Sequence, residues 1–234
     1  MKFFIIVLSI IFCKIVNAQE ITVFYYERPP FYYTNESGKA AGILVDKVRK
    51  IKSKKYPIIF KVYPPKRQLL AIAAKEKNIC GLGWFKTIDR EKIGVFSTGI
   101  FTDEPLGLMI HKDFGNLKNI SVETIFKNKS FEFLKKNSFK YSDNIEVLEA
   151  ELKPTTYTVS SSIATMLEMI GVRQRYYTFI DRVEANYIFK TKPSLRDSII
   201  FIPTDEGKKG NSRHLYCSNN IPEDFSKLIK SFSF

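Results

Sequence analysis

The sequence predicts an α/β fold in which parallel strands alternate with helices. Two observations lead to this prediction. Between residues 21 and 85, short runs rich in β-branched and aromatic residues alternate with segments whose apolar residues recur every three or four positions. Prolines, glycines and polar turns separate these segments. A β-α-β-α-β order of this kind is typical of parallel strands joined by crossover helices.

The expected elements follow one another along the whole chain. In the first half, strands are predicted at 21–26, 56–65 and 79–85, and helices at 43–53 and 66–78. In the second half, strands are predicted at 104–112, 130–136 and 198–203, and helices at 121–126, 159–171, 182–189 and 221–232. The helix at 159–171 begins with serines, which we interpret as helix caps rather than as a nucleophile.

Residues 1–18 have the pattern of a secretory signal peptide. Lys2 is followed by the apolar run FFIIVLSIIF, and the small residue Ala18 fits a cleavage site that leaves Gln19 first in the mature chain. The run is short for a membrane span, but a retained N-terminal anchor is an open alternative. A cleaved chain would be secreted, most simply into a bacterial periplasm.

The chain is strongly basic. Its formal net charge is +13, and removal of the leader with its two lysines, Lys2 and Lys14, lowers it to +11. The densest cationic stretch, KVRKIKSKK, is interpreted as the solvated face of the helix at 43–53. A basic surface favours anionic partners. Nucleic acid is not expected among them, because no recognition motif accompanies the charge.

Two cysteines, Cys80 and Cys217, follow the leader. An even number of cysteines in an oxidising compartment favours one disulfide, and two buried free thiols are the alternative. His111 and His214 have no ligand spacing with each other or with the cysteines, so no metal site is predicted. No cofactor and no catalytic residue are predicted either.

Four stretches together resemble one protein family. They are ERPPFYYTNESGKAAGILVD, YPPKRQLLAIAAKEKNICGLG, KTIDREKIGVFSTGIFTDEPLGLMI and MLEMIGVRQRYYTFIDRVEANYIF. Their order and spacing resemble the extracellular solute-binding proteins of family 3, the amino-acid-type periplasmic binding proteins with the type II fold. The resemblance covers nearly all of the chain after the leader. The third stretch contains the T-x-x-R pattern of that family at Thr87 and Arg90.

The resemblance implies two α/β lobes joined by two hinge strands, with a ligand cleft between the lobes. Residues 19–109 and 200–234 would form the first lobe, and residues 110–199 the second. Cys80 and Cys217 would then both lie in the first lobe, where a disulfide between them is sterically possible. We expect the protein to be a monomer.

Arg90 is the first candidate ligand-binding residue. The resemblance implies that its planar guanidinium binds a ligand carboxylate through two parallel hydrogen bonds. The alternative is a surface arginine paired with Asp89 or Glu91. Thr87 would either support the same site or cap the helix that begins after it.

Further candidates in the first lobe flank this motif and the first strand. Trp84, Phe85 and Lys86 stand where members of the family commonly carry hydroxyl donors, and they are predicted to form an aromatic wall with a cation. The alternative for Trp84 is a place in the core. Arg28 and Phe31 are candidates because they lie where the first ligand loop of the family lies.

In the second lobe, Ser138 and Asp181 are the candidates. Ser138 follows a predicted strand and would stand at a helix N-terminus, which favours anions. Members of the family hold the ammonium group of their ligand with an aspartate, and Asp181 lies one residue from that position. If Asp181 points away from the cleft, the expected ligand is a carboxylate or another anion without an amine.

The leading hypothesis is a periplasmic protein without enzymatic activity that binds a small, polar, carboxylate-bearing solute. This solute would be an amino acid or a related organic acid, and an ABC permease of the inner membrane would receive it. One alternative is a sensor module that presents its liganded state to a separate receptor. A second is a dehydratase of prephenate-like acids on the same scaffold, with Glu27 or Glu184 as the acid.

Overall fold

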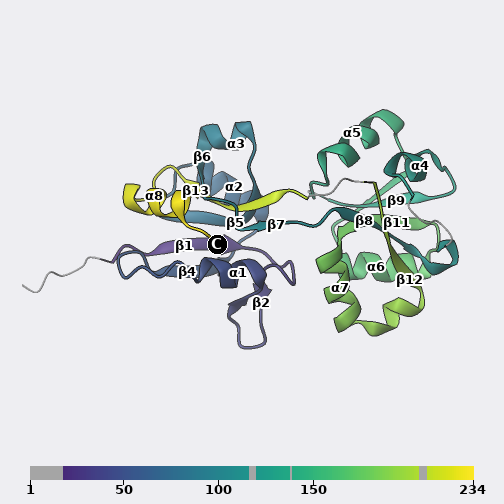
Figure 1. Cartoon of the computed structure of the whole chain (residues 1–234), viewed down its shortest axis with the longest axis horizontal. Helices are drawn as coiled ribbons and strands as arrows, with labels where there is room; N and C mark the ends of the chain where they lie inside the picture. The colour runs from purple at the N-terminus through teal and green to yellow at the C-terminus, as the bar shows by residue number, and fades with distance from the viewer. Residues whose placement is uncertain (1–17, 116–119, 138, 206–209) are drawn as a thin grey trace, which may run out of the picture.

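The computed structural model describes residues 18–115, 120–137, 139–205 and 210–234, and these form two lobes, each built around its own β-sheet (Figure 1). The predicted α/β class with two lobes is confirmed. Of the expected leader, residues 1–17 lie outside the described part of the chain. No helix within the described part is long and apolar enough to span a membrane.

The first lobe contains a mixed sheet. Its strand order is β4 (Ile58–Val62), β1 (Ile21–Tyr25), β5 (Ile79–Phe85), β13 (Ser212–Ser218) and β6 (Gly94–Phe96), and β7 (Phe101–Thr102) also pairs with β13. β1 is parallel to both β4 and β5, as the alternating order predicts. β13 is antiparallel to β5 and β6. The small hairpin of β2 (Tyr33–Thr34) and β3 (Ala40–Ala41) projects from this lobe.

The second lobe contains a five-stranded sheet. Its order is β10 (Thr156–Val159), β9 (Glu132–Lys136), β11 (Tyr176–Asp181), β8 (Leu106–His111) and β12 (Ile199–Pro203). β9 is parallel to β10 and β11, whereas β8 is antiparallel to β11 and β12. Both 106–109 and 200–203 belong to this sheet. The lobe boundaries expected after residues 109 and 199 therefore fall within, or at the start of, strands of the second sheet.

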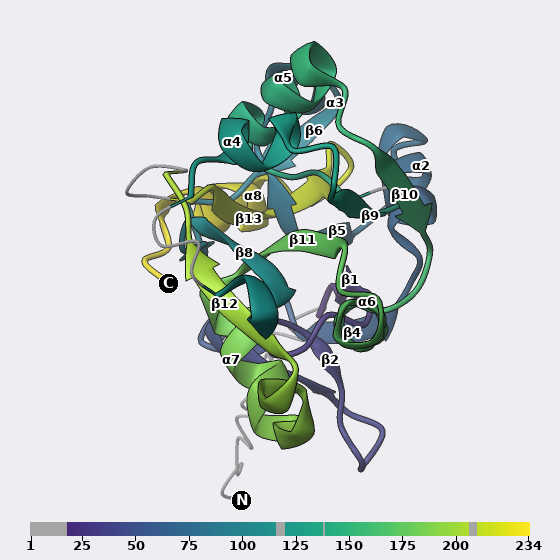
Figure 2. The same ribbon diagram turned by 90° about the vertical axis from the view of Figure 1, so that its right-hand side faces the viewer.

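Helices cover both sheets, as Figures 1 and 2 show. Those of the first lobe are α1 (Ile43–Val48), α2 (Pro65–Ala73), α3 (Ile88–Ile93) and α8 (Glu223–Ser231). Those of the second are α4 (Val122–Lys127), α5 (Asp143–Leu152), α6 (Ile163–Val172) and α7 (Arg182–Thr191), with the 3-10 turns η1 (Lys112–Phe114) and η2 (Pro193–Asp197). Ser162 caps α6 by accepting from the backbone N–H of Thr165, which is the role expected of a serine at this place.

The first helix is shorter than expected. It ends at Val48, whereas the apolar spacing predicted a helix over 43–53. A longer helix would stack Lys50 and Lys54 one turn apart, and like charges at that spacing destabilise a helix. Ile51 is still buried in the core of the first lobe, because the turn that follows α1 folds back over it.

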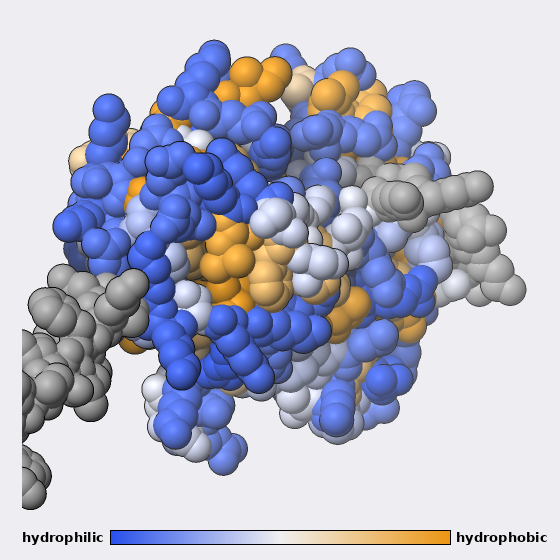
Figure 3. Space-filling model, turned by 60° about the vertical axis from the view of Figure 1, so that its left-hand side comes forward, coloured by the Kyte–Doolittle hydropathy of each residue, from blue (hydrophilic) through white to orange (hydrophobic). Residues whose placement is uncertain are grey.

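Each lobe buries its own hydrophobic core. In the first, β1, α1, β5 and α8 contribute residues such as Val23, Leu82 and Phe225. In the second, successive residues of β11 point to opposite faces of the sheet, so Tyr177 and Ile180 belong to separate clusters. Figure 3 shows that hydrophilic residues cover most of the surface on the side that it draws. Because each lobe has its own hydrophobic core, the lobes are separate packing units that meet across a cleft.

The predicted disulfide between Cys80 and Cys217 is confirmed. Cys80 of β5 and Cys217 of β13 are direct cross-strand partners, with Cα atoms 3.9 Å apart, and both are fully buried. The bond therefore joins two neighbouring strands of the first sheet, one that precedes the second lobe in sequence and one that follows it.

Candidate functional site in the interlobe cleft

A cavity of about 610 Å³ lies between the two lobes. From the first lobe it is lined by the residues after β1, the start of α2, the end of β5, and one residue each of α3 and β13. From the second lobe it is lined by the end of β9 and the residues after it, and by α6 and α7. Cavities of roughly 300–1,000 Å³ hold small molecules. This cavity is the candidate ligand site.

The end of β5 presents aromatic residues to the cavity because the strand is bulged at Gly83. The register against β13 shifts here, and Gly83 has a φ of 79°, which a glycine adopts without strain. A Cβ at this position would come within 2.6 Å of the Tyr32 ring. Bulges redirect the side chains that follow them. Trp84 and Phe85 accordingly both line the cavity.

Arg90 faces the cavity from α3. Its guanidinium lies over Trp84, 4.8 Å from the ring centroid, and its Nη1 donates to the backbone carbonyl of Phe85 at 2.8 Å. Burial lowers the pKa of Arg90, but an arginine stays charged at neutral pH. None of the carboxylates among the described residues forms an ion pair with Arg90. Its remaining N–H groups can therefore donate to a ligand.

The sequence neighbours of Arg90 do not line the cavity. Lys86 pairs with Glu91 at 2.7 Å and Lys92 pairs with Asp89 at 3.3 Å, so both carboxylates named as possible surface partners of Arg90 are engaged elsewhere. Thr87 caps α3, its hydroxyl accepting from the backbone N–H of Arg90 at 3.4 Å. Capping by Thr87 orients the first turn of α3, from which Arg90 projects. Thr87 was expected either to support the ligand site or to cap the helix, and the structure shows it as the helix cap.

The second lobe contributes Lys136, at the end of β9. Its ammonium group donates to the backbone carbonyl of Ser161 at 2.6 Å. Burial lowers the pKa of Lys136, and this effect outweighs the attraction of Glu184. A lysine has three N–H donors. Within the described part of the chain only Ser161 accepts from Lys136, so two donors are left for a ligand.

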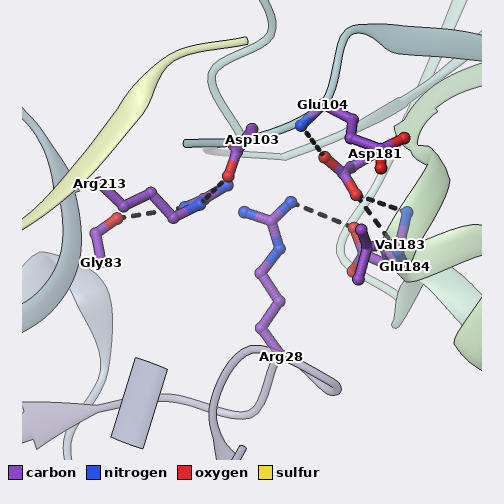
Figure 4. Close-up of polar contacts among 8 residues, drawn as sticks. All are labelled: Arg28, Gly83, Asp103, Glu104, Asp181, Val183, Glu184 and Arg213. Carbon is purple, nitrogen blue, oxygen red and sulfur yellow. Dashed lines mark hydrogen bonds and ion pairs between the residues drawn. The ribbon is translucent and has the colours of Figure 1, made fainter. Parts of the chain in front are cut away.

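A buried ion pair joins the two lobes at the cavity wall. Arg28 Nη2 donates to Glu184 Oε2 in α7 at 3.1 Å, and the two side chains are 7% and 3% exposed. The guanidinium also lies over the rings of Phe31 and Phe139, 5.2 and 4.7 Å from their centroids. Burial alone would lower the pKa of Arg28, but the attraction of Glu184 holds it well above its ordinary value. Figure 4 shows Arg28 directed at Glu184.

A second buried ion pair lies beside the first. Arg213 of β13 binds Asp103 through two parallel hydrogen bonds of 2.5 and 2.6 Å, and its Nη1 donates to the carbonyl of Gly83 at 3.1 Å (Figure 4). Arg213 is 2% exposed and Asp103 8% exposed. Arg213 therefore ties the β5 bulge to the segment in which the chain leaves the first lobe.

Asp181 does not line the cavity. It is fully buried and caps α7, accepting from the backbone N–H groups of Val183 at 2.6 Å and Glu184 at 3.4 Å through Oδ1. Its Oδ2 accepts from the backbone N–H of Glu104 at 2.8 Å. α7 begins immediately after Asp181, so backbone N–H groups in the first turn of the helix hold the carboxylate of Asp181. The carboxylate that this turn presents to the cavity is Glu184.

We expect Asp181 to make stability depend on pH between about 4 and 6. Burial, with a contribution from Asp103, raises the pKa of Asp181 from 3.8 to about 6. Below that range the carboxyl of Asp181 is protonated in both the folded and the unfolded state. As pH rises, the unfolded state ionises first, so the free energy of unfolding falls until the folded state also ionises.

The variant Asp181→Asn tests this expectation, because asparagine also caps helices but does not ionise. Urea unfolding of both proteins is measured from pH 4 to pH 7.5. The stability of the variant relative to wild type should rise through that interval and then level off. A difference between the two proteins that is constant with pH would contradict the expectation.

The structure brings four of the expected site residues together at the cavity, namely Arg28, Trp84, Phe85 and Arg90. Phe31 is fully buried in the first core, where both Arg28 and Arg213 lie 5.2 Å from its ring centroid. Phe31 therefore supports Arg28 and Arg213 from the core of the first lobe and does not itself line the cavity. Ser138 lies outside the described residues.

Sequence reasoning missed four of the cations that line the cavity among the described residues, namely Lys66, Lys136, Lys140 and Arg213. Lys136 follows a run of core residues in β9, and only the packing of β9 against α6 directs its ammonium group to the cleft. Arg213 stands in a stretch that no motif marks. A buried arginine is found from sequence only when its partner is known, and Asp103 lies 110 residues away.

Cations outnumber carboxylates along the cavity wall. Among the described residues, the cations are Arg28, Lys66, Arg90, Lys136, Lys140 and Arg213, and the carboxylates are Glu27 and Glu184. The apolar part of the wall includes Leu82, Trp84, Phe85, Phe139, Ile163 and Ile188. The cavity therefore suits an anion that also carries an apolar part.

Several solved structures are similar to this chain over most of its length. An ancestral arginine-binding protein bound to arginine has a TM-score of 0.68 at 15% identity, covering 90% of this chain and 88% of that one. The GluR0 ligand-binding core with L-glutamate has a TM-score of 0.69 at 18% identity, covering 91% and 93%. The chain has the two-lobed periplasmic-binding-protein fold. The cavity lies between the two lobes of this fold.

A third structure with the periplasmic-binding-protein fold comes from work on glutathione import via GshT and the cystine ABC importer TcyBC of Streptococcus mutans. Its TM-score is 0.71 at 16% identity, covering 91% of this chain and 86% of that one. No family model matches the sequence, and no curated protein does. At such identities the likeness is one of fold, so the ligand must be argued from the residues of this cavity.

Proposed function

We propose that this chain is a periplasmic solute-binding protein that captures a small carboxylate-bearing solute between its lobes and delivers it to an ABC importer. One observation carries the proposal. Arg90 presents guanidinium donors that no described carboxylate engages to the interlobe cavity, while it is held over Trp84 and by the carbonyl of Phe85. A planar guanidinium held in this way is suited to two parallel hydrogen bonds with a carboxylate.

The comparisons favour binding over catalysis. Among the structures with this fold, one is described with arginine bound and another with L-glutamate, and a further one as the substrate-binding protein of an amino acid ABC transporter. Of the residues that the structure describes, two carboxylates line the cavity, and both are engaged by other groups, Glu184 by Arg28 and Glu27 by Thr34. Neither has the arrangement of a free general acid, so the dehydratase alternative has no specific observation in its favour.

The disulfide supports a location outside the cytoplasm. Cys80 and Cys217 are buried and bonded, and disulfides persist in oxidising compartments such as the periplasm. The leader-like residues 1–18 fit the same location. We propose that the mature monomer folds as a first lobe of residues 19–102 and 212–234 and a second lobe between them, joined by the two segments that cross the cleft.

Isothermal titration against a panel of amino acids and organic acids tests the proposed function. We expect at least one carboxylate to bind, and mass spectrometry of small molecules that copurify with the protein narrows the panel. Absence of binding by folded protein across the panel would contradict the proposal. Reduced uptake of the identified solute by cells that lack the chain would support import, and unchanged uptake would favour the sensor alternative.

The variant Arg90→Ala is expected to weaken binding of the acid about 10- to 150-fold. This range corresponds to the roughly 1.5–3 kcal/mol that a hydrogen bond to a charged group contributes. Lys86→Ala is the matched control, because this cation is four residues away, pairs with Glu91 and does not line the cavity. The control should bind within about twofold of wild type. Equal losses in both variants would argue for a general charge effect rather than a carboxylate contact.

A further inference from the structure

We propose that the cavity selects acids without an amino group, because Arg28 of the first lobe already occupies the carboxylate that a ligand ammonium would need. The proposal rests on the proposed function of the same cavity and names its ligand class. The ligand is a carboxylic acid with an apolar or aromatic body. The ion pair between Arg28 and Glu184 supplies, from within the protein, the cation that an amino acid would bring.

The carboxylates at the cavity wall are both engaged by groups of the chain itself. Among the described residues these are Glu27 and Glu184. Glu27 accepts from the backbone N–H of Thr34 at 2.9 Å through one oxygen and from its hydroxyl at 2.6 Å through the other. Glu184 is buried against Arg28. A ligand ammonium that entered the cavity would therefore find the buried carboxylate, Glu184, already paired with a cation of the chain, and the exposed Glu27 already engaged by Thr34.

The two nearest aspartates do not change this conclusion. Asp181 gives both of its oxygens to backbone N–H groups and does not line the cavity. Asp103 gives both of its oxygens to Arg213. Asp103, Asp181 and Glu184 therefore each have a donor supplied by the chain, as Figure 4 shows.

Arg28 cannot give up its place without a large cost. It is 7% exposed, lies over two aromatic rings and is 3.1 Å from Glu184. Separating a buried ion pair leaves an uncompensated charge. An ammonium group at Glu184 would have to displace Arg28 or lie beside it as a like charge. Both arrangements disfavour amines.

Acids meet the opposite conditions. Arg90 in the first lobe and Lys136 in the second both have donors that no described carboxylate engages. Arg28 Nε is also buried without a hydrogen-bond partner among the described residues. Between these cations the wall is apolar, with Trp84 and Phe139 among its residues. An acid can thus place its carboxylate on a cation and its body on the aromatic wall.

Matched pairs of compounds test the inference on the wild-type protein. L-Phenylalanine and 3-phenylpropanoate differ in the α-ammonium group, as do L-glutamate and glutarate. Affinities are measured by isothermal titration, with fluorescence of Trp84, the one tryptophan of the chain, as a second signal. We expect at least one amine-free acid to bind, and about tenfold or more tightly than its amino-acid partner, because a buried charge without a partner is disfavoured.

Two variants shift this preference in opposite directions. Arg28→Ala frees the carboxylate of Glu184. The affinity for the amino acid of each pair should then rise at least about tenfold relative to the affinity for its acid. In Arg28→Ala/Glu184→Gln that gain should disappear. Glu184→Gln alone frees the guanidinium of Arg28 and should tighten binding of the acid. Circular dichroism verifies that each variant folds, and if Arg28→Ala does not fold, wild type and Glu184→Gln are sufficient for the test.

The outcomes separate the two proposals. If wild type binds the amino acids as tightly as their acids, or more tightly, the inference is overturned while solute binding stands. If none of the four compounds binds, the inference is also overturned, and the broader panel decides on solute binding itself. A preference for the acids that Arg28→Ala leaves unchanged would overturn the role given to Arg28.

Discussion

Removal of the disulfide between Cys80 and Cys217 is expected to lower the free energy of unfolding by about 5 kcal/mol, the value that the chain-entropy model gives for so long a loop. The two cysteines are 137 residues apart in sequence, and the chain between them includes the whole second lobe. Without the bond, the unfolded chain gains the freedom that this loop closure removes. Such a loss is a large part of the roughly 5–15 kcal/mol by which proteins of this size are stable.

Urea unfolding with and without a reducing agent measures this effect. The variant Cys80→Ala/Cys217→Ala is the control, because its midpoint should not respond to the reducing agent and should match that of the reduced wild type within the small change in packing. An unchanged midpoint for wild type, together with thiol titration proving complete reduction, would contradict the expected contribution of the bond.

The second large effect is expected for Asp103→Ala, which should lower the free energy of unfolding by about 3–5 kcal/mol. This change leaves Arg213 buried without its carboxylate, and Arg213 is 2% exposed and makes both of its shortest hydrogen bonds to Asp103. The hydrogen bond that Arg213 keeps, to the carbonyl of Gly83 at 3.1 Å, and its contacts with the rings of Phe31 and Phe85 do not neutralise the charge.

Asp89→Ala is the matched control for this prediction. Asp89 pairs with Lys92 on the surface, where the two side chains are 91% and 70% exposed, so its loss should cost no more than about 1 kcal/mol. The double variant Asp103→Leu/Arg213→Met should be less destabilised than Asp103→Ala, because it removes the stranded charge as well. An effect of Asp103→Ala as small as that of Asp89→Ala would contradict the role of the buried pair.

Several parts of the fold could be predicted from the sequence because their causes are local. Residues 79–85 form a strand with the predicted bounds, since ICGLGWF is a short apolar run between turns. The helix after the serines begins where Ser162 provides a cap. By contrast, β13 was not predicted: its sequence, SRHLYCS, carries an arginine and a histidine. These polar residues are accommodated in the centre of the sheet by partners elsewhere in the chain, such as Asp103 and the carbonyl of Ser97.

The same distinction applies to the candidate site. The segment from Trp84 to Arg90 could be predicted as a whole, because its aromatic residues and Arg90 lie within a few residues of the end of one strand. The separate roles within it could not. Lys86 and Thr87 face away from the cavity because the bulge at Gly83 and the start of α3 set the direction of each side chain.

By itself, the sequence determined the alternation of strands and helices and the basic, aromatic character of the segment around Arg90, and it favoured a disulfide between Cys80 and Cys217 over two free thiols. These properties depend on composition and on neighbours within a few residues. Only the tertiary structure decided which carboxylate faces the cavity and what binds it. Glu184 rather than Asp181 does so because α7 begins at Arg182 and uses Asp181 as its cap. Arg28 pairs with Glu184, 156 residues away in sequence, because the two lobes meet at the cavity.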